Sequence, residues 1–205
     1  MGVEDDDSVI AVTTSDGAGQ ILIASRNGVA IRFDETDVRS MGRTAYGVRG
    51  LTLREDDEVV AMEVLRPGTA VLTLTENGFG KRTAIDDYRV TARGGVGIIN
   101  IQTTERNGRV VGVAAVAESD EVMFITQQGK VLRTSAGAIS MIGRNTQGVR
   151  LIDMEPEDKA VSLARLEEQE GQENGAGDLT TLSTTDGSPS PPPVTGEESD
   201  PTDEQ

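Results

Sequence analysis

The chain repeats itself at an interval of about fifty residues, and the repeat occurs three times. Its clearest marker is an apolar run that ends in a glycine, at residues 21–28, 71–78 and 122–129. Two further sets of residues keep the same offsets of 50 and 51: Gly47, Gly97 and Gly148, and Arg32, Arg82 and Arg133. Periods of roughly twenty to fifty residues are typical of arrays and propellers, in which each unit buries its apolar face only against its neighbours. The repeat therefore predicts a row of similar units.

Within each unit the pattern indicates β-strands. In the first unit an apolar run meets a tight turn at Asn27 and Gly28, and a second apolar run follows as far as Phe33. Asn-Gly between two such runs is the strongest short-range hairpin signal, and a type I′ turn there needs positive φ at both central residues. A third strand is expected near 48–53 and a closing strand at 58–65, which is matched by 109–116 and 159–166 in the later units. About four strands per unit is the number found in a propeller blade.

The repeat divides the chain into five parts. We expect the end of a truncated preceding blade with a linker, three blades, and an acidic tail: 1–20, 21–70, 71–121, 122–166 and 167–205. Residues 7–12 match 57–62 and should form the closing strand of the truncated preceding blade. The tail is dominated by Gly, Glu, Ser, Thr and Pro, so it cannot bury enough apolar area to offset its ordering entropy and is expected to be disordered. The predicted fold class is all-β, with propeller-like antiparallel blades in a partial disc.

The charge is distributed unevenly. The net charge is −16, yet residues 167–205 carry eleven acids and no base. Residues 1–166 hold the other 24 acids and all 19 Lys and Arg side chains, and six of these bases fall in each of the ranges 21–65, 71–116 and 122–166. The body is therefore a mixed-charge surface with regularly spaced cations, and the tail supplies most of the negative charge.

Composition excludes several classes of function. Cysteine and histidine are both absent, which excludes disulfides, metal sites built from Cys or His, Cys nucleophiles and histidine acid–base chemistry. No apolar run approaches the roughly 20 residues that span a bilayer, so no membrane association is expected. The sequence therefore predicts a binding module without a metal site or catalytic chemistry of its own.

Several motifs carry a resemblance to a known family. Residues 142–152 read Ile-Gly-Arg-Asn-Thr-Gln-Gly-Val-Arg-Leu-Ile, and residues 80–83 and 104–108 read Gly-Lys-Arg-Thr and Thr-Glu-Arg-Asn-Gly. These strings closely resemble the later blades of the C-terminal domain of DNA gyrase A. The resemblance implies a β-pinwheel whose basic rim wraps DNA, so that strand passage introduces negative supercoils. One departure is at residues 91–97, Thr-Ala-Arg-Gly-Gly-Val-Gly, where the family's wrapping heptad reads Gln-Arg-Arg-Gly-Gly-Lys-Gly.

The resemblance also implies a role for the repeated cations as contacts to DNA. In residues 29–33 large apolar side chains alternate with Ala30 and Arg32, so Arg32 and its equivalents should face away from the core. They could form a track of phosphate contacts, or pair with a nearby acid such as Asp34, or only keep the surface soluble. The candidate DNA-binding residues are Arg32, Arg43, Arg49, Lys81, Arg82, Arg93, Lys130, Arg133, Arg144 and Arg150.

The function implied by the resemblance is a non-catalytic DNA-wrapping module of DNA gyrase, an ATP-dependent type IIA topoisomerase. ATP and Mg²⁺ would act elsewhere in that complex, and this chain would need no cofactor. Its partners would be duplex DNA, the N-terminal region of gyrase A and the gyrase B protein, in the cytoplasm at the nucleoid. Two alternatives stay open: a propeller-type protein-interaction module, and the equivalent domain of topoisomerase IV.

Overall fold

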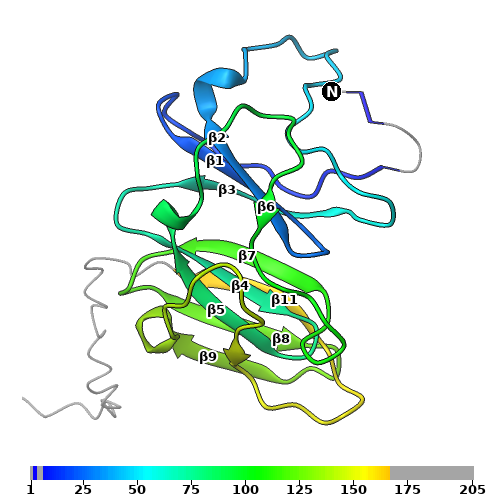
Figure 1. Cartoon of the computed structure of the whole chain (residues 1–205), viewed down its shortest axis with the longest axis vertical. Coiled ribbons are helices and arrows are strands. Elements are labelled where there is room, and N and C mark those ends of the chain that lie inside the picture. The colour runs from blue at the N-terminus through cyan, green and yellow to red at the C-terminus, as the bar shows by residue number, and fades with distance from the viewer. Residues whose placement is uncertain (1, 4–6, 167–205) are drawn as a thin grey trace, which may run out of the picture. The chain divides into compact units, whose positions relative to one another are not determined.

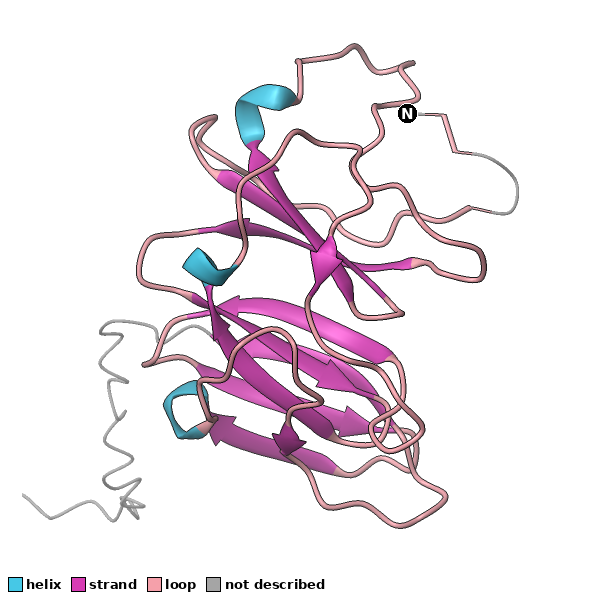
Figure 2. Cartoon of the chain, viewed as in Figure 1, coloured by secondary structure: helices cyan, strands magenta, loops and turns pink. Residues whose placement is uncertain are grey.

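The computed structural model describes residues 2–3 and 7–166, which fold into three antiparallel β-sheets that follow one another along the chain (Figures 1 and 2). We call the sheets blades 1, 2 and 3. Blade 1 contains, in spatial order, β3 (Val59–Leu65), β1 (Gln20–Ser25), β2 (Val29–Asp34) and β6 (Ile98–Ile99). Blade 2 contains β10 (Val149–Arg150), β5 (Phe79–Ala84), β4 (Ala70–Thr75) and β7 (Val110–Val116). Blade 3 contains β11 (Ala160–Leu166), β8 (Glu121–Thr126) and β9 (Val131–Ser135).

A short 3₁₀ helix follows the second strand of each blade. The three helices are η1 (Glu35–Asp37), η2 (Ile85–Asp87) and η3 (Ala136–Ala138). Their recurrence after β2, β5 and β9 shows that the sequence repeat is also a structural repeat. The all-β prediction is confirmed, and the predicted disordered tail lies outside the described residues.

Blades 1 and 2 are each completed by the repeat that follows them. The fourth strand of blade 1, β6, comes from the second repeat, and Ile99 pairs with Val29 of β2. The fourth strand of blade 2, β10, comes from the third repeat, and Val149 pairs with Gly80 of β5. Neighbouring blades are therefore joined by shared sheets as well as by side-chain packing.

The predicted hairpins are present, but their turns differ from the expected type. Three residues, Arg26, Asn27 and Gly28, connect β1 to β2. Gly28 has a positive φ of 84°, whereas Asn27 is not among the residues with positive φ. A type I′ turn at Asn27-Gly28 is therefore wrong. The connection is a three-residue loop that ends in a left-handed glycine, and that loop needs positive φ at one position only.

Two predicted strands near the N-terminus are absent from the structure. Residues 48–53 and 7–12 lie outside every strand, and Val9, Ile10 and Val12 are exposed. The predictions for these segments are wrong. The match of 48–53 in the second repeat contains β6, which pairs with β2 of the blade before it, and the match of 7–12 in the first repeat contains part of β3, which pairs with β1. The described residues contain no blade before blade 1. The closing strands expected near 58–65, 109–116 and 159–166 are present as β3, β7 and β11.

The core lies between the blades and is mainly aliphatic. Leu22 of β1 packs in one cluster with Val71 of β4 and Val113 of β7, between blades 1 and 2. The equivalent cluster between blades 2 and 3 includes Leu72 and Phe124. Each junction also receives a buried isoleucine from the strand-exchanging segment, Ile101 in the first and Ile152 in the second. Burying such a side chain is worth about 1.5–3 kcal/mol, so the exchanged segments contribute directly to stability.

Candidate nucleic-acid interface

Arg32 joins blade 1 to blade 2. Its Nη1 donates to the carbonyl oxygens of Ile85 and Tyr88, at 2.7 and 2.9 Å, in the 3₁₀ turn of the next blade. Its Nε and Nη2 donate to the side-chain oxygen of Gln20 in its own blade. The guanidinium is thus used in contacts between blades, and the side chain is half-buried.

Arg82 repeats this arrangement one blade later. It is 7% exposed, and its Nε and Nη2 donate to the carbonyls of Ile139 and Gly137, at 2.9 and 3.1 Å. The prediction that these arginines face away from the core is therefore wrong for Arg32 and Arg82. The reason is that these arginines, on β2 and β5, contact the 3₁₀ turn of the following blade. Arg133, the third member, is exposed and pairs with Glu121 of its own blade.

The second set of in-register arginines also crosses blade boundaries. Arg144 donates from Nε to the carbonyl of Asp87, at 2.7 Å, and from Nη1 to that of Ile99, at 2.6 Å. Its guanidinium lies 5.9 Å from the centre of the Tyr88 ring. Arg93 makes the equivalent pair of backbone hydrogen bonds one repeat earlier. Both side chains are half-buried, so part of each remains on the surface.

Lys81 is enclosed within the protein. It is 0% exposed, and its ammonium group donates a hydrogen bond to the hydroxyl of Thr83. Burial lowers the pKa of Lys81 to about 8, although the nearby Asp87 carboxylate acts in the opposite direction. The structure therefore does not place this candidate residue on a surface that DNA could reach.

The remaining candidates are exposed: Arg43, Arg49, Lys130, Arg133 and Arg150. The Lys130 ammonium donates to the carbonyl of Asp153, and Arg150 forms an ion pair with the carboxylate of the same residue, at 2.8 Å. The side chains of Arg150 and Asp153 are 61% and 84% exposed, so this pair is well solvated and free to exchange partners.

A basic cluster that the repeat did not predict lies at the outer edge of blade 2. The guanidinium carbons of Arg106 and Arg150 lie 4.7 and 5.6 Å from the centre of the Phe79 ring. Phe79 is buried, while both arginines are exposed. The ring face attracts the two cations and holds them near each other. The sequence repeat did not predict Arg106, because the equivalent residues in the other repeats are Asp56 and Glu157.

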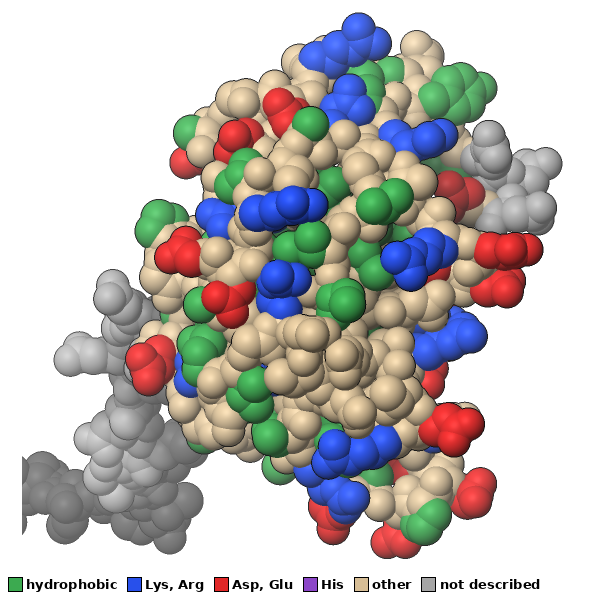
Figure 3. Space-filling view, in the orientation of Figure 1, with side chains coloured by type: hydrophobic (Ala, Val, Ile, Leu, Met, Phe, Trp, Pro, Cys, Tyr) green, Lys and Arg blue, Asp and Glu red, His purple; other side chains and the backbone are tan. Residues whose placement is uncertain are grey.

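Two further exposed arginines were missed although the sequence signal was available. Arg39 and Arg89 are 50 residues apart and follow the 3₁₀ helices of blades 1 and 2, and only Ser140 breaks the series in the third repeat. Figure 3 shows Lys and Arg side chains spread along the face that carries β6, while Asp and Glu lie mainly toward its sides. The exposed cations thus form a distributed surface rather than a pocket.

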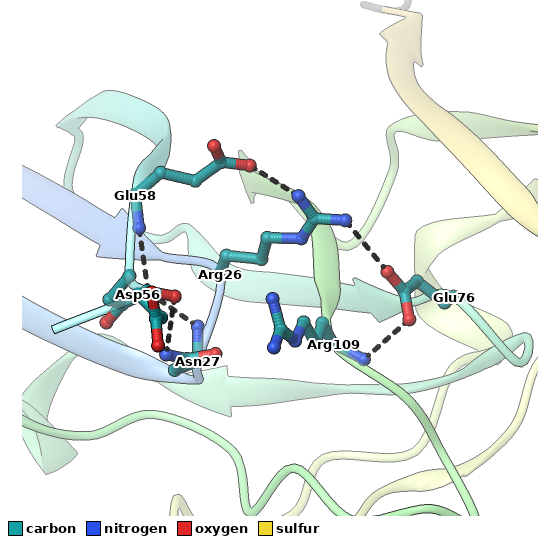
Figure 4. Close-up of polar contacts among 7 residues, drawn as sticks. Arg26, Asn27, Asp56, Glu58, Glu76 and Arg109 are labelled. Atoms are coloured by element: carbon teal, nitrogen blue, oxygen red, sulfur yellow. Dashed lines mark hydrogen bonds and ion pairs between the residues drawn. The ribbon is translucent and has the colours of Figure 1, made fainter.

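An ion pair also connects the hairpin turns of blades 1 and 2 (Figure 4). Arg26 bonds Glu58 of its own blade at 2.7 Å and Glu76 of the next blade at 3.2 Å. The hydrogen bonds to Glu76 and Glu58 raise the pKa of the Arg26 guanidinium, so it stays charged. Glu76 also accepts the backbone N–H of Arg109, at 3.1 Å. This contact neutralises the cation locally and makes Arg26 a structural residue.

Sequence comparison places this arrangement of blades in a family. Residues 19–66, 69–117 and 120–167 each match the family described as the DNA gyrase C-terminal domain, beta-propeller. The chain belongs to this family. It is 45% identical to the DNA gyrase A protein of Salmonella typhimurium over 168 residues and 46% identical to that of Haloquadratum walsbyi over 160 residues. These matches cover 82% and 77% of this chain, but only 19% of each relative.

Solved structures agree with the family assignment. The C-terminal domain of DNA gyrase A superimposes with a TM-score of 0.68 and 30% identity, over 72% of this chain and 50% of that one. The C-terminal domain of topoisomerase IV gives a TM-score of 0.77 at 24% identity, over 81% of this chain and 52% of that one, and shares the fold alone. The chain is therefore a β-pinwheel domain of the gyrase A type that spans about a fifth of its full-length relatives. Its described residues include no helix of the length and apolarity that would cross a membrane.

Proposed function

We propose that this chain is a DNA-wrapping module that binds the backbone of duplex DNA and supports negative supercoiling. The observation that carries the proposal is the pair Arg106 and Arg150, both in contact with the ring of Phe79 at the outer edge of a blade. Both arginines are exposed, so each can release counterions from a phosphate without breaking the fold.

The wider surface supports backbone contact rather than base recognition. Exposed arginines recur on the segments that follow the 3₁₀ helices of blades 1 and 2, as Arg39 and Arg43 in the first repeat and Arg89 in the second. Contacts repeated from blade to blade favour a DNA path that bends along the row, because each blade then meets the backbone in a similar way. Binding of this kind is largely independent of base sequence and falls steeply with salt.

We also propose that this chain acts as part of a DNA gyrase assembly. The chain would perform no chemistry itself and would act with the N-terminal region of gyrase A and with the gyrase B protein, in the cytoplasm at the nucleoid. ATP and Mg²⁺ would act elsewhere in that complex. The support for these statements is the similarity to DNA gyrase A proteins.

The test is fluorescence anisotropy with two linear duplexes of unrelated sequence, each at low and moderate salt. We expect similar affinities for both duplexes and a steep loss of affinity as salt rises. The double variant Arg106→Ala/Arg150→Ala should bind more weakly. Arg66→Ala is the control, because Arg66 is exposed in the turn between β3 and β4. Equal affinities of the double variant and the parent, or affinity independent of salt, would refute the proposed surface.

A further inference from the structure

Two segments leave their own blade, pair with the preceding blade and return. They are residues 85–101, which contain β6, and residues 136–152, which contain β10, and we call them arm 2 and arm 3. Arm 2 runs over blade 1 between η2 and β6 (Figure 1). It carries Arg89, an exposed arginine of the surface proposed to bind DNA. The position of arm 2 therefore decides where Arg89 meets the duplex.

Two buried side chains join the ends of arm 2. Tyr88 lies near the beginning of the arm and is 1% exposed, and Asn100 lies near its end and is 0% exposed. The Tyr88 hydroxyl donates a hydrogen bond to Oδ1 of Asn100, at 2.5 Å. Burial raises the pKa of the Tyr88 phenol, so the hydroxyl keeps the proton that it donates. We call this contact the clasp.

The clasp is anchored in the centre of blade 2. Asn100 donates from Nδ2 to the hydroxyl of Thr73 in β4, at 3.1 Å, and Thr73 is 0% exposed. Within the described part of the chain, no buried side-chain nitrogen or oxygen lacks a hydrogen-bond partner. A buried network of this kind fixes its members more strictly than apolar packing does, because each hydrogen bond has a preferred direction.

The same two residues bind blade 1 through their backbone. The carbonyl oxygen of Tyr88 accepts a hydrogen bond from Nη1 of Arg32, at 2.9 Å. The N–H group of Asn100 donates to the carbonyl oxygen of Gly28, at 2.8 Å. Each residue thus contacts blade 1 by its main chain and the other end of the arm by its side chain. The clasp therefore holds arm 2 against both blades.

Arm 3 has no clasp. Ile139 and Leu151 hold the positions of Tyr88 and Asn100, and Phe124 holds the position of the anchoring threonine. All three side chains lie in or against the apolar cluster between blades 2 and 3. They contribute packing there but no directed hydrogen bond. The clasp is therefore a property of arm 2 and not of the repeat.

Arg89 is the residue next to the clasp along the chain. Tyr88 is buried and Arg89 is exposed, so the clasp fixes the backbone from which the arginine extends. Arg144 supports the same backbone, because it donates to the carbonyl oxygens of Asp87 and Ile99, at 2.7 and 2.6 Å. The main chain of arm 2 is therefore held in place before DNA binds, which lowers the entropy cost of a contact made by Arg89.

We propose that Tyr88 and Asn100 are positioning residues for DNA binding, whose clasp holds arm 2 so that Arg89 meets a phosphate without further ordering. This inference rests on the proposed DNA-binding function and gives arm 2 a role that arm 3 does not share. The two residues act through Arg89 and touch no DNA themselves. When the clasp is lost, Arg89 still reaches its phosphate, but the arm is ordered only on binding. Affinity then falls while the number of phosphate contacts stays the same.

The first test is a double-mutant cycle on DNA affinity with the full chain, measured by fluorescence anisotropy on one linear duplex. Tyr88→Phe removes only the hydroxyl and should raise Kd about threefold, with an unchanged slope of log Kd against log salt. Arg89→Ala should reduce that slope by about 0.9. In the Arg89→Ala background, Tyr88→Phe should have little further effect, because the positioned contact is already gone. Each variant is first shown by circular dichroism to be folded.

The control cycle pairs Tyr88→Phe with Arg106→Ala, which lies outside arm 2, and there the two effects should add. Additive effects of the Tyr88 and Arg89 substitutions, or equal coupling to Arg106, would overturn the proposal and leave the clasp a purely structural contact. Thr73→Val, which removes the anchor of Asn100, is a second variant and should show the same coupling to Arg89. A parent chain that does not bind DNA would refute the proposed function itself, and the inference with it.

The second test needs no DNA and measures backbone hydrogen exchange in the parent and in Tyr88→Phe. Loss of the clasp should speed exchange across residues 89–99 of arm 2, because local opening becomes easier. Exchange across residues 140–150 of arm 3 should stay the same, since that arm has no clasp. Unchanged exchange in arm 2, or an equal rise in both arms, would contradict the role of the clasp whether or not the chain binds DNA.

Discussion

Arg26 and Glu76 hold the same position in consecutive repeats and form an ion pair with each other, with 3.2 Å between Nη2 and Oε1 (Figure 4). Equivalent positions of neighbouring blades thus carry opposite charges, and the two side chains pair across the junction between the blades. Arg82 also contacts the neighbouring blade, but through a backbone acceptor, since it donates to the carbonyl of Ile139 in the following blade. Many of the cations in this chain therefore serve the junctions between blades rather than a ligand.

Removing the Arg26–Glu76 pair should have a small and salt-dependent effect. The two side chains are 38% and 26% exposed, so solvent screening limits the coupling to about 0.5 kcal/mol. The measurement is a double-mutant cycle with Arg26→Met and Glu76→Gln, followed by urea unfolding at two salt concentrations. A coupling free energy well above about 1 kcal/mol, or one that salt does not reduce, would contradict this expectation.

Arg82→Ala should destabilise the fold by about 2–3 kcal/mol, because it leaves buried carbonyl oxygens without a donor. Arg82→Lys should recover little of the loss, since one ammonium cannot reproduce the two directed bonds to Ile139 and Gly137. Arg133→Ala, which removes an exposed side chain at the equivalent position, is the matched comparison and should cost much less. Equal losses of unfolding free energy for the Arg82 and Arg133 variants would argue against the assignment of Arg82 to the blade junction.

Lys81→Met should stabilise the protein at pH 7. The pKa of Lys81 is about 8 in the folded state and higher in the unfolded chain, so the unfolded state binds more protons between those values. Stability therefore rises with pH above about 8, and below that pH the full cost of burying the ammonium is present. The variant should gain about 1–3 kcal/mol at pH 7, and the gain should shrink by about pH 9.5. A variant that is less stable than the parent at pH 7 would show that the hydrogen bond to Thr83 outweighs the desolvation cost.

The hairpin glycines should differ in their tolerance of substitution. Gly78→Ala adds a Cβ atom 2.7 Å from the carbonyl oxygen of Ile152, so a buried backbone segment must move. Gly129→Ala meets no described atom within 4 Å and carries only the cost of a left-handed residue, about 1 kcal/mol. Thermal unfolding of the two variants checks this, and a larger loss for Gly129→Ala would be the contrary result.

The sequence predicted the local elements well. The glycine-bearing turn at Gly28 and the closing strand β3 follow from short-range patterns, and the structure contains both. The pairing of the third strand was harder to predict. The sequence repeat shows which residues of different units correspond, but it does not show which sheet each segment joins. Residues 98–99 pair with the preceding blade, whereas 48–49 have no such blade among the described residues.

The site was harder to predict for a related physical reason. Alternation along a strand separates two faces, but in a row of blades both faces are covered, so Arg82 and even Lys81 are buried. Arg82 was predicted to bind DNA because an arginine recurs at this position in every repeat. That recurrence reflects the junction between blades, which also recurs. Arg106 was missed because its contact with Phe79 depends on packing between segments far apart in the sequence, and its equivalents are acids.

We expect exposed arginines outside the blade junctions to hold DNA, while in-register arginines such as Arg32 hold the blades together. The most direct measurement is the slope of log Kd against log salt for the parent, for Arg106→Ala/Arg150→Ala and for Arg32→Ala, each under conditions where it is folded. Each lost phosphate contact should reduce the slope by about 0.9, so the double variant should lose about 1.8 and Arg32→Ala should lose nothing. A reduced slope for Arg32→Ala with an unchanged slope for the double variant would show that DNA contacts the blade junctions instead.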